Sequence, residues 1–199
     1  MAHIKPRDRS EVPDLEELFV QFESMAGFVP NSLLTMAHHP PILRGYMQLG
    51  HAVMNTGSVD AGLKRLVALV ASTAAGCRYC QGHMATFAAF SGSSPEALER
   101  VWRFEFEAGF SPAEKAALRL ARDGAQVPNA VEAEHFADLR QHFSDAQIVE
   151  IVGVIAMFGF LNRWNDTMAT TLESLPMEAA SQKIGKSGWT AGKHVAENS

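Results

Sequence analysis

The sequence predicts an all-α fold, and three observations support this expectation. Apolar residues recur at helical spacing in one segment after another, as Leu15, Leu18, Phe19 and Phe22 do near the start of the chain. Capping residues and prolines separate these segments. No segment between turn signals alternates with a period of two, so β-strands have little support. The 47% of apolar and 20% of charged residues are typical of a globular protein with a buried core.

Five helices are expected in the first half of the chain. Asp14 and Asn31 stand where helices begin, and Gly27 stands where the first one ends. Pro40 stops one helix and starts the next, because proline suits a first helical turn. Asp60 precedes a segment with a long apolar stripe. These helices are expected over residues 14–27, 32–39, 42–55, 61–76 and 77–90.

Four further helices are expected in the second half. A capping-box pattern joins Ser111 to Glu114, and Ser144 or Asp145 caps the last and longest helix. The expected ranges are 96–105, 115–126, 131–143 and 145–173. From about Pro176 the composition shifts to Ser, Gly, Lys and Ala. We therefore expect a single helical domain over residues 1–175 and a polar tail over 176–199, which is either loosely ordered or docked on a neighbouring subunit.

Charge and hydropathy restrict the partners and the compartment. The net charge of −5 argues against nucleic acid, because phosphate binding needs a basic surface. Residues 148–161 form the most apolar run, but they include Glu150 and fall short of the ~20 residues that a membrane span needs. We expect this run to be a buried helix and the protein to have no membrane partner. The polar start lacks the apolar core of a signal peptide, which favours a cytoplasmic location.

The segment GCRYCQGHMATFA, residues 76–88, holds the chain's only two cysteines, Cys77 and Cys80, together with His83. On a helix, residues three apart lie on one side. Cys77 would stand at the helix start, where the dipole favours a thiolate. Cys80 would lie one turn from an imidazole that can accept its proton. The three residues together offer a nucleophile, a resolving thiol and a base.

Other interpretations of this segment are weaker. Free cysteines are often simply buried. A structural zinc site needs four ligands, and the segment offers three, with His38, His39 or His51 as distant fourth candidates. Covalent haem attachment needs a histidine directly after the second cysteine, where Gln81 stands. The segment therefore favours redox chemistry with neither a metal nor a cofactor.

Three stretches of the chain resemble a known family. LKRLVALVASTAAGCRYCQGHMATFAAFSG, residues 63–92, resembles the core of the alkylhydroperoxidase D-like (AhpD-like) proteins of the carboxymuconolactone decarboxylase superfamily. MAGFVPNSLLTMAHHPPILRGYMQL, residues 25–49, resembles their N-terminal helical hairpin. FGFLNRWNDTMAT, residues 158–170, resembles their C-terminal core helix. The resemblance covers about residues 12–173.

The resemblance implies an all-helical homo-oligomer, a trimer or a hexamer, that reduces hydroperoxides with electrons from a dithiol donor. It implies that Cys80 is the peroxide-attacking thiol and Cys77 its disulfide partner. The position of Cys77 at the helix start favours Cys77 as the more acidic thiol, whereas the neighbouring His83 favours Cys80. The donor could be a lipoyl-type dithiol, a thioredoxin-like protein or another small thiol.

Two positions depart from the family's pattern. Well-studied members have a histidine four residues after the second cysteine, where this chain has Met84, so His83 matches the subgroup with a histidine at three. They also have a glutamate twelve residues before the first cysteine, where this chain has Arg65. Arg65 cannot act as a base. It could stabilise a thiolate if it points inward, or lie on the helix surface beside Lys64.

Two other functions compete with peroxide reduction. The disulfide could serve a non-enzymatic redox sensor, in which it changes packing. The superfamily also includes a lyase that decarboxylates a muconolactone, but that chemistry does not need a C-x-x-C pair, and the sequence shows no basic cluster for a dicarboxylate. Several polar residues could either line the active-site pocket or make subunit contacts: Asn162, Arg163, Asn165 and Asp166.

Overall fold

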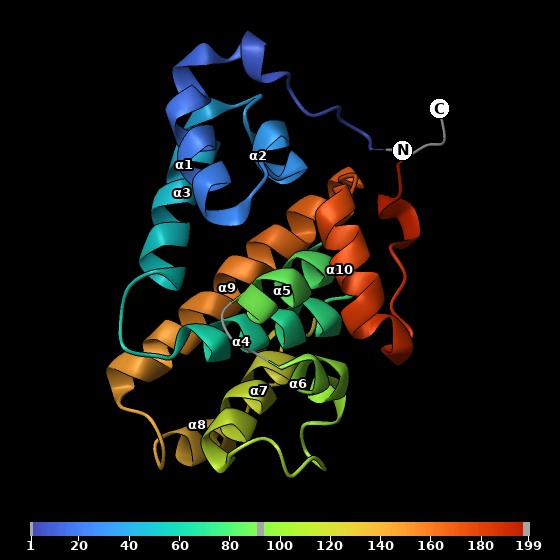
Figure 1. Cartoon of the computed structure of the whole chain (residues 1–199). Coiled ribbons are helices and arrows are strands. Elements are labelled where there is room, and N and C mark those ends of the chain that lie inside the picture. Colours follow the sequence, from blue (N-terminus) through green and yellow to red (C-terminus); the bar gives the residue numbers. More distant parts are fainter. Residues whose placement is uncertain (1, 91–93, 197–199) are drawn as a thin grey trace.

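The computed structural model describes residues 2–90 and 94–196, with the side chains of residues 89, 90 and 95 left aside. Within these ranges every regular element is an α-helix or a short 3₁₀ helix. The predicted all-α fold is confirmed. Figure 1 shows the central helices α4, α5 and α9 with the N-terminal helices above them and α6, α7 and α8 below.

The N-terminal region contains three helices: α1 (Glu16–Ala26), α2 (Asn31–Met36) and α3 (Pro40–Met54). Gly27 ends α1 with a left-handed φ of 81°, a conformation that glycine adopts without steric cost. α3 packs along α9, and Figure 1 shows α1 and α3 beside each other at the edge of the molecule. The expected ranges for these three helices agree with the structure to within a few residues at each end.

The centre of the fold is formed by α4 (Ala61–Ala74), α5 (Arg78–Phe90) and α9 (Asp145–Met168). α4 contacts α5, α7 and α9, and it is buried on almost every side. A helix that is apolar all round belongs inside a protein. Lys64 is a buried charged residue on α4, and its ammonium group forms an ion pair with Glu150 and donates to two backbone oxygens.

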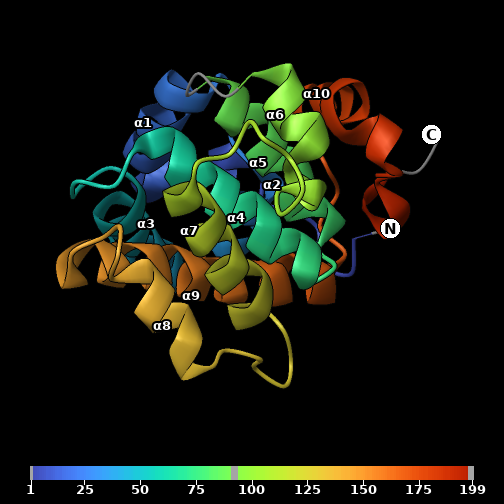
Figure 2. The same ribbon diagram turned by 90° about the horizontal axis from the view of Figure 1, so that it is seen from below.

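The region between α5 and α9 differs from expectation mainly at its helix ends. The helix expected over 96–105 is divided into α6 (Pro95–Arg100) and a 3₁₀ turn at Val101–Arg103. α7 (Pro112–Gly124) begins with the predicted capping box. α8 (Ala133–Leu139) is shorter than the expected range 131–143. Figure 2 shows α7 lying against α4, and α8 packs against α7.

The C-terminal region departs furthest from the sequence-based expectation. α9 ends at Met168 rather than near residue 173, because Ala169 adopts a left-handed φ of 47°. A further helix, α10 (Ser174–Ile184), follows and packs against α5. Gly82 on α5 allows the residues just before α10 to approach closely, since a Cβ there would lie 3.1 Å from Leu172 Cδ2.

The segment after α10 is also docked on the chain itself. Trp189 Nε1 donates to the carbonyl oxygen of Arg78 at 3.3 Å. The backbone N–H of Leu172 donates to the carbonyl oxygen of the buried His194 at 2.8 Å. The residues expected to form a polar tail therefore include a helix and two anchored side chains. Their composition of Ser, Gly, Lys and Ala did not indicate this, because a few buried contacts at the right spacing are enough to hold a short segment.

α9 is the one helix in the described part of the chain that is long and apolar enough to cross a membrane by length and composition. Its buried residues include Ile151, Val154 and Phe158, which belong to the hydrophobic core. Core helices of globular proteins commonly pass this test. The contacts of α9 with α3, α4, α5 and α7 identify it as a core helix.

Candidate functional site

The two cysteines stand at the beginning of α5. Gly76 turns the chain between α4 and α5 with a left-handed φ of 79°, and Cys77 is the residue directly before the first helical residue, Arg78. The backbone N–H of Cys80 donates to Cys77 Sγ at 3.4 Å. Both cysteines are free thiols, with 0% and 2% of their surface exposed. The sulfur of Cys77 thus receives a hydrogen bond from a backbone N–H at the N-terminus of α5.

Cys80 lies deeper, against α9. Asn165 Nδ2 donates to Cys80 Sγ at 3.5 Å and also to the carbonyl oxygen of Leu161 at 3.0 Å. Burial raises the pKa of the Cys80 thiol well above its ordinary value, and the nearby Cys77 raises it further, while the Asn165 hydrogen bond lowers it. Cys80 is therefore a protonated thiol at rest. Its use as a nucleophile requires a base.

A histidine–carboxylate pair lies on the same helix. His83 Nε2 is 2.7 Å from Glu173 Oε2, and Glu173 is the residue directly before α10. The Tyr79 hydroxyl donates to Glu173 Oε1 at 2.8 Å, and the backbone N–H of Asn31 donates to the same oxygen. Burial opposes the ionisation of Glu173. The positive charge that His83 carries when it is protonated and the hydrogen bonds from His83 and from the backbone of Asn31 outweigh burial and lower the Glu173 pKa. Glu173 is thus an ionised carboxylate that fixes the orientation of the imidazole.

Glu173 is the functional candidate that sequence reasoning missed. The family's pattern directs attention to the position of Arg65, where no carboxylate is available. The carboxylate beside His83 instead comes from a residue 90 positions later in the chain. Nothing in the local sequence around Glu173 marks it, because the contact depends on how α10 packs against α5.

The sequence predicted that His83 and Cys80 would be neighbours, and the structure places both on one face of α5. Residues three apart on a helix have Cβ atoms about 5–6 Å from each other. Among the described residues, however, the two side chains form hydrogen bonds with other partners. His83 contacts Glu173, and Cys80 accepts a hydrogen bond from Asn165. The His83 ring stacks on Tyr79, with 4.4 Å between ring centroids. Proton transfer from Cys80 to His83 thus needs a small side-chain rotation or one bridging water.

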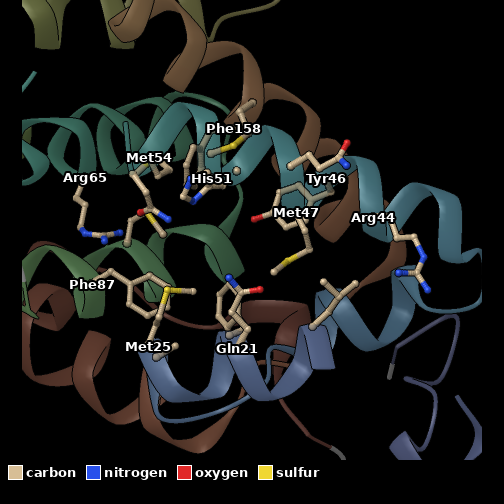
Figure 3. Close-up of a pocket in the computed structure, with 18 residues that line it drawn as sticks. Gln21, Met25, Arg44, Tyr46, Met47, His51, Met54, Arg65, Phe87 and Phe158 are labelled. Atoms are coloured by element: carbon tan, nitrogen blue, oxygen red, sulfur yellow. The ribbon is translucent and has the colours of Figure 1, made fainter. Parts of the chain in front are cut away.

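A pocket of about 460 Å³ lies beside the cysteine helix, between α1, α3, α5 and α9. This volume is typical of small-molecule sites. Figure 3 shows the Tyr46 hydroxyl pointing into the pocket, with Phe87 and Met25 on the opposite wall. Tyr46 lies close enough to Cys80 for a thiolate there to raise the Tyr46 pKa, which burial raises even more. Met84, one turn after Cys80 on α5, also lines the pocket. The pocket therefore reaches the surroundings of the Cys80 sulfur.

Basic side chains also line this pocket. Arg65 is half-buried, with its guanidinium carbon 5.5 Å from the centroid of the Phe87 ring. Figure 3 shows Arg65 at one end of the pocket and Arg44 at the other, with His51 between them. The interpretation of Arg65 as a solvated surface residue is wrong, because Arg65 lines the pocket, at the opposite end from Arg44. The sequence could not show this, because the three residues come from two helices.

The other candidates have separate roles. Asn162 is buried, and its amide has no hydrogen-bond partner among the described residues. Arg163 is exposed and donates to the carbonyl oxygen of Gly159. Asp166 pairs with Lys193 of the C-terminal segment at 2.9 Å. Of these residues, only Asn165 contacts a cysteine sulfur.

The distant histidines considered as zinc ligands do not join the cysteines. His38 Nε2 lies 2.9 Å from the carbonyl oxygen of Lys5, and His51 lines the pocket described above. Among the described residues, no group of three or more His, Cys, Asp or Glu side chains is placed to hold a metal ion.

Comparison with known proteins places this site in context. Residues 40–123 match the carboxymuconolactone decarboxylase family. No curated protein sequence matches the chain. The crystal structure of a cysteine-to-alanine variant of the debrominase Bmp8, in complex with 2,3,4-tribromopyrrole, is 31% identical to the chain. The match covers 90% of this chain and 96% of the debrominase chain, with a TM-score of 0.85.

Two further solved structures share the fold. One is the alkylhydroperoxidase AhpD core of an uncharacterized peroxidase-related protein from Ralstonia eutropha JMP134. It is 23% identical to this chain. The match covers 92% of this chain and 97% of the Ralstonia protein, with a TM-score of 0.81. The other is an uncharacterized peroxidase-related protein from Silicibacter sp. TM1040. It is 20% identical to this chain. The match covers 87% of this chain and 92% of the Silicibacter protein, with a TM-score of 0.77.

Proposed function

Because this chain belongs to the AhpD-like proteins of the carboxymuconolactone decarboxylase superfamily, we propose that it is a thiol-dependent peroxidase. In this proposal Cys77 and Cys80 are a redox pair that reduces alkyl hydroperoxides. The observation that carries the proposal is the arrangement around α5: two free thiols at its start, a His83–Glu173 pair on the same helix, and a pocket lined by Met84, one turn after Cys80.

The first step is ionisation of Cys80. Its buried thiol is protonated at rest, so the proton passes to His83 when a hydroperoxide occupies the pocket. Glu173 stabilises the imidazolium that forms, because its carboxylate already contacts His83 Nε2 at 2.7 Å. Asn165 Nδ2 stabilises the thiolate through its hydrogen bond to Cys80 Sγ.

The second step is attack on the peroxide. The Cys80 thiolate bonds to the terminal oxygen of the hydroperoxide, the O–O bond breaks, and the alkoxide takes the proton back from His83 and leaves as an alcohol. Sulfur is oxidised by two electrons to a sulfenic acid. The Tyr46 hydroxyl stays protonated and points into the pocket, where it can donate a hydrogen bond to the departing oxygen.

The third step regenerates the site. Cys77 attacks the Cys80 sulfur, an S–S bond forms, the S–O bond breaks, and water leaves. The proton of the Cys77 thiol leaves with the hydroxyl oxygen as this water, and the contact of the Cys80 backbone N–H with Cys77 Sγ at 3.4 Å holds the two residues close together. A dithiol donor then reduces the disulfide by thiol–disulfide exchange and becomes a disulfide itself.

A second candidate is reductive dehalogenation, favoured by the 31% identity to the debrominase Bmp8 over nearly the full length of both chains. The reaction balances with the same two thiols: an aryl halide and a dithiol yield the arene, a disulfide and a hydrogen halide. The apolar pocket beside Cys80 suits a halogenated ring as well as an alkyl hydroperoxide. An assay that supplies both substrate classes separates the two candidates.

The test is consumption of cumene hydroperoxide, and in parallel of a brominated pyrrole, with lipoyl-type, thioredoxin-like and small-molecule dithiols as donors. Cys80→Ser should abolish turnover. Cys77→Ser should react once and stop at a sulfenic acid. His83→Ala should slow the reaction by about 10²–10⁴-fold. If reduced wild-type protein consumes no hydroperoxide with any donor, the peroxidase proposal fails and a redox sensor remains. A single turnover in Cys80→Ser but not in Cys77→Ser would reverse the two assignments.

The lyase alternative is tested with the same preparations. The basic residues that line the pocket reopen the question of a dicarboxylate substrate, which the sequence alone had argued against. Lyase chemistry does not use the thiols, so decarboxylation of a carboxymuconolactone should be the same in wild type and in Cys80→Ser. We propose that neither form decarboxylates this substrate.

The homo-oligomer expected from the family remains a proposal, and the surface of the chain supports it. α3 and α9 pack against each other and leave large apolar side chains exposed on their outer faces: Ile42, Leu49, Val149, Val152 and Phe160. Tyr46 of α3 stacks with Phe160 of α9, which joins the two faces into one surface. A continuous apolar surface of this kind commonly marks a protein interface. We also propose a cytoplasmic location, in which a free cysteine pair stays reduced.

A further inference from the structure

We propose that the pocket beside Cys80 selects apolar hydroperoxides that carry a carboxylate at the end remote from the peroxide, and that Arg65 binds this carboxylate. The inference rests on the proposed peroxidase function and adds the class of substrate. It also gives a role to the arginine that stands where the family's pattern has a glutamate.

The body of the pocket is apolar and adaptable. Five of the chain's nine methionines line it: Met25, Met47, Met54, Met84 and Met157. Methionine side chains are flexible and polarisable, so they fit ligands of varied shape and contact aromatic rings favourably. Phe87 and Phe158 complete the walls. An alkyl chain or an aryl ring would be well accommodated here.

The charged side chains at the pocket are cations. Arg44 and Arg65 line it, and none of the described lining residues carries a carboxylate. Arg44 is exposed and donates to the backbone oxygen of Asp14 at 3.1 Å, so water weakens its attraction for an anion. Arg65 is half-buried, and its planar guanidinium can hold both oxygens of a carboxylate. Burial lowers the pKa of Arg65, which means that a nearby anion would stabilise its charged form.

The spacing along α5 relates the anion position to the reactive sulfur. Phe87, over whose ring the Arg65 guanidinium lies, is seven residues after Cys80. At 1.5 Å per residue this is about 10 Å along the helix axis. Met84 lies between them and lines the pocket. A carboxylate at Arg65 and a peroxide at Cys80 would therefore be joined by an apolar segment such as a substituted benzene ring or a medium-length alkyl chain.

The carboxylate takes no part in the chemistry. As in the proposed mechanism, the Cys80 sulfur gains the terminal peroxide oxygen, the O–O bond breaks, and the substrate leaves as the hydroxy acid. Arg65 thus contributes binding energy from a part of the substrate that does not react.

Three probes test the inference: cumene hydroperoxide, its para-carboxylate and the methyl ester of that carboxylate. The carboxylate and the ester have almost the same shape and differ in charge. For wild-type protein we expect kcat/KM to be at least about tenfold higher for the carboxylate than for the ester, the size expected of one charge-assisted pair. Equal values for the two probes would overturn the inference.

Variants at Arg65 locate the effect. Arg65→Gln should remove the preference for the carboxylate over the ester, and thermal unfolding followed by circular dichroism should show that the variant is folded. Arg65→Lys keeps the charge and should retain part of the preference. Arg140→Gln, on the far side of the molecule beside Phe136, should change neither rate. If Arg65→Gln slows both probes equally, Arg65 acts on the thiolate rather than on the substrate, and the inference is wrong.

A binding measurement separates this inference from the function on which it rests. 4-Isopropylbenzoate has the shape of the acidic probe but no peroxide, and its binding to the reduced protein can be followed by calorimetry. We expect binding that Arg65→Gln weakens by about tenfold. If wild-type protein reduces none of the three hydroperoxides but still binds the acid through Arg65, the peroxidase proposal fails and the anion site stands. If binding is undetectable or insensitive to Arg65→Gln, the anion site is refuted.

Discussion

Glu173→Gln offers a direct test of the histidine–carboxylate pair, because it removes the charge beside His83 with almost no change of shape. The carboxylate lies 2.7 Å from His83 Nε2 and is largely buried. A hydrogen bond to a charged group contributes about 1.5–3 kcal/mol. Since about 1.4 kcal/mol corresponds to a factor of ten, the rate of the first reaction with peroxide should fall roughly 10- to 100-fold.

The assay is a single-turnover reaction of reduced protein with cumene hydroperoxide, followed by the loss of free thiols. Glu178→Gln is the matched control, since Glu178 lies one turn further along α10 and is exposed. This control should react like the wild type. A rate for Glu173→Gln within about twofold of the wild type would refute the role of the pair.

A double-variant cycle shows whether Glu173 acts through His83. If it does, Glu173→Gln should slow wild-type protein but have little further effect in His83→Ala protein, because the partner is already gone. Additive effects would mean that Glu173 acts only by stabilising the fold. Thermal unfolding of each variant measures that contribution separately.

The lowered pKa of Glu173 also predicts how stability changes with pH. A carboxyl whose pKa is lower in the folded state stabilises the fold above its unfolded pKa, near 4.5, and loses this contribution as the pH falls towards its folded value. The difference in unfolding free energy between wild type and Glu173→Gln should therefore be constant near neutral pH and shrink below about pH 4.5. A difference that grows in acid would contradict this.

Three further predictions concern oxidation, stability and assembly. Mild peroxide should remove two hydrogens from the intact mass and both free thiols, and the persistence of both thiols would exclude a redox role. Glu150→Gln should destabilise the fold by roughly 3 kcal/mol in urea unfolding, because it leaves the Lys64 ammonium, 2% exposed, without its counter-charge. Burial opposes the ionisation of Glu150, but its hydrogen bonds and Lys64 outweigh burial and lower its pKa to about 2. The difference in unfolding free energy between wild type and Glu150→Gln should therefore persist at pH 5 and diminish as the pH falls from 4.5 towards 2. A difference that stays constant over this range would refute the role of the ion pair. In light scattering, Phe160→Glu should reduce the mass of the oligomer while Phe106→Glu, at an exposed site elsewhere, should not, and a wild-type mass of 21.7 kDa would refute the oligomer.

The sequence predicted the parts of the site that depend on local spacing. Cys77, Cys80 and His83 lie within seven positions, so the geometry of one helix determines how they face each other. The all-α class and most helix ranges were accessible for the same reason, since periodicity, caps and prolines act locally. These predictions needed no knowledge of how the helices pack.

The parts that depend on packing could not be predicted. The sequence left open whether Arg65 points inward or lies on the helix surface beside Lys64. In the structure Lys64 is buried with Glu150, and Arg65 lines the pocket. α4 is covered on several sides by other helices, so neither side chain could be assigned to solvent from its neighbours. Glu173 was missed because its contact with His83 forms only when α10 docks on α5.

Glu173 connects the chemistry of the site to the architecture of the whole chain. Its Oε1 accepts hydrogen bonds from the Tyr79 hydroxyl and from the backbone N–H of Asn31, and its Oε2 contacts His83 Nε2. The carboxylate thus links the start of α10 to α5 and to the start of α2. The Tyr79 hydroxyl in turn accepts a hydrogen bond from the backbone N–H of Ser32, so α5 is also joined directly to α2. A carboxylate held by three elements is fixed in position, so the imidazole that it orients can receive the Cys80 proton without the reorganisation that a mobile partner would require.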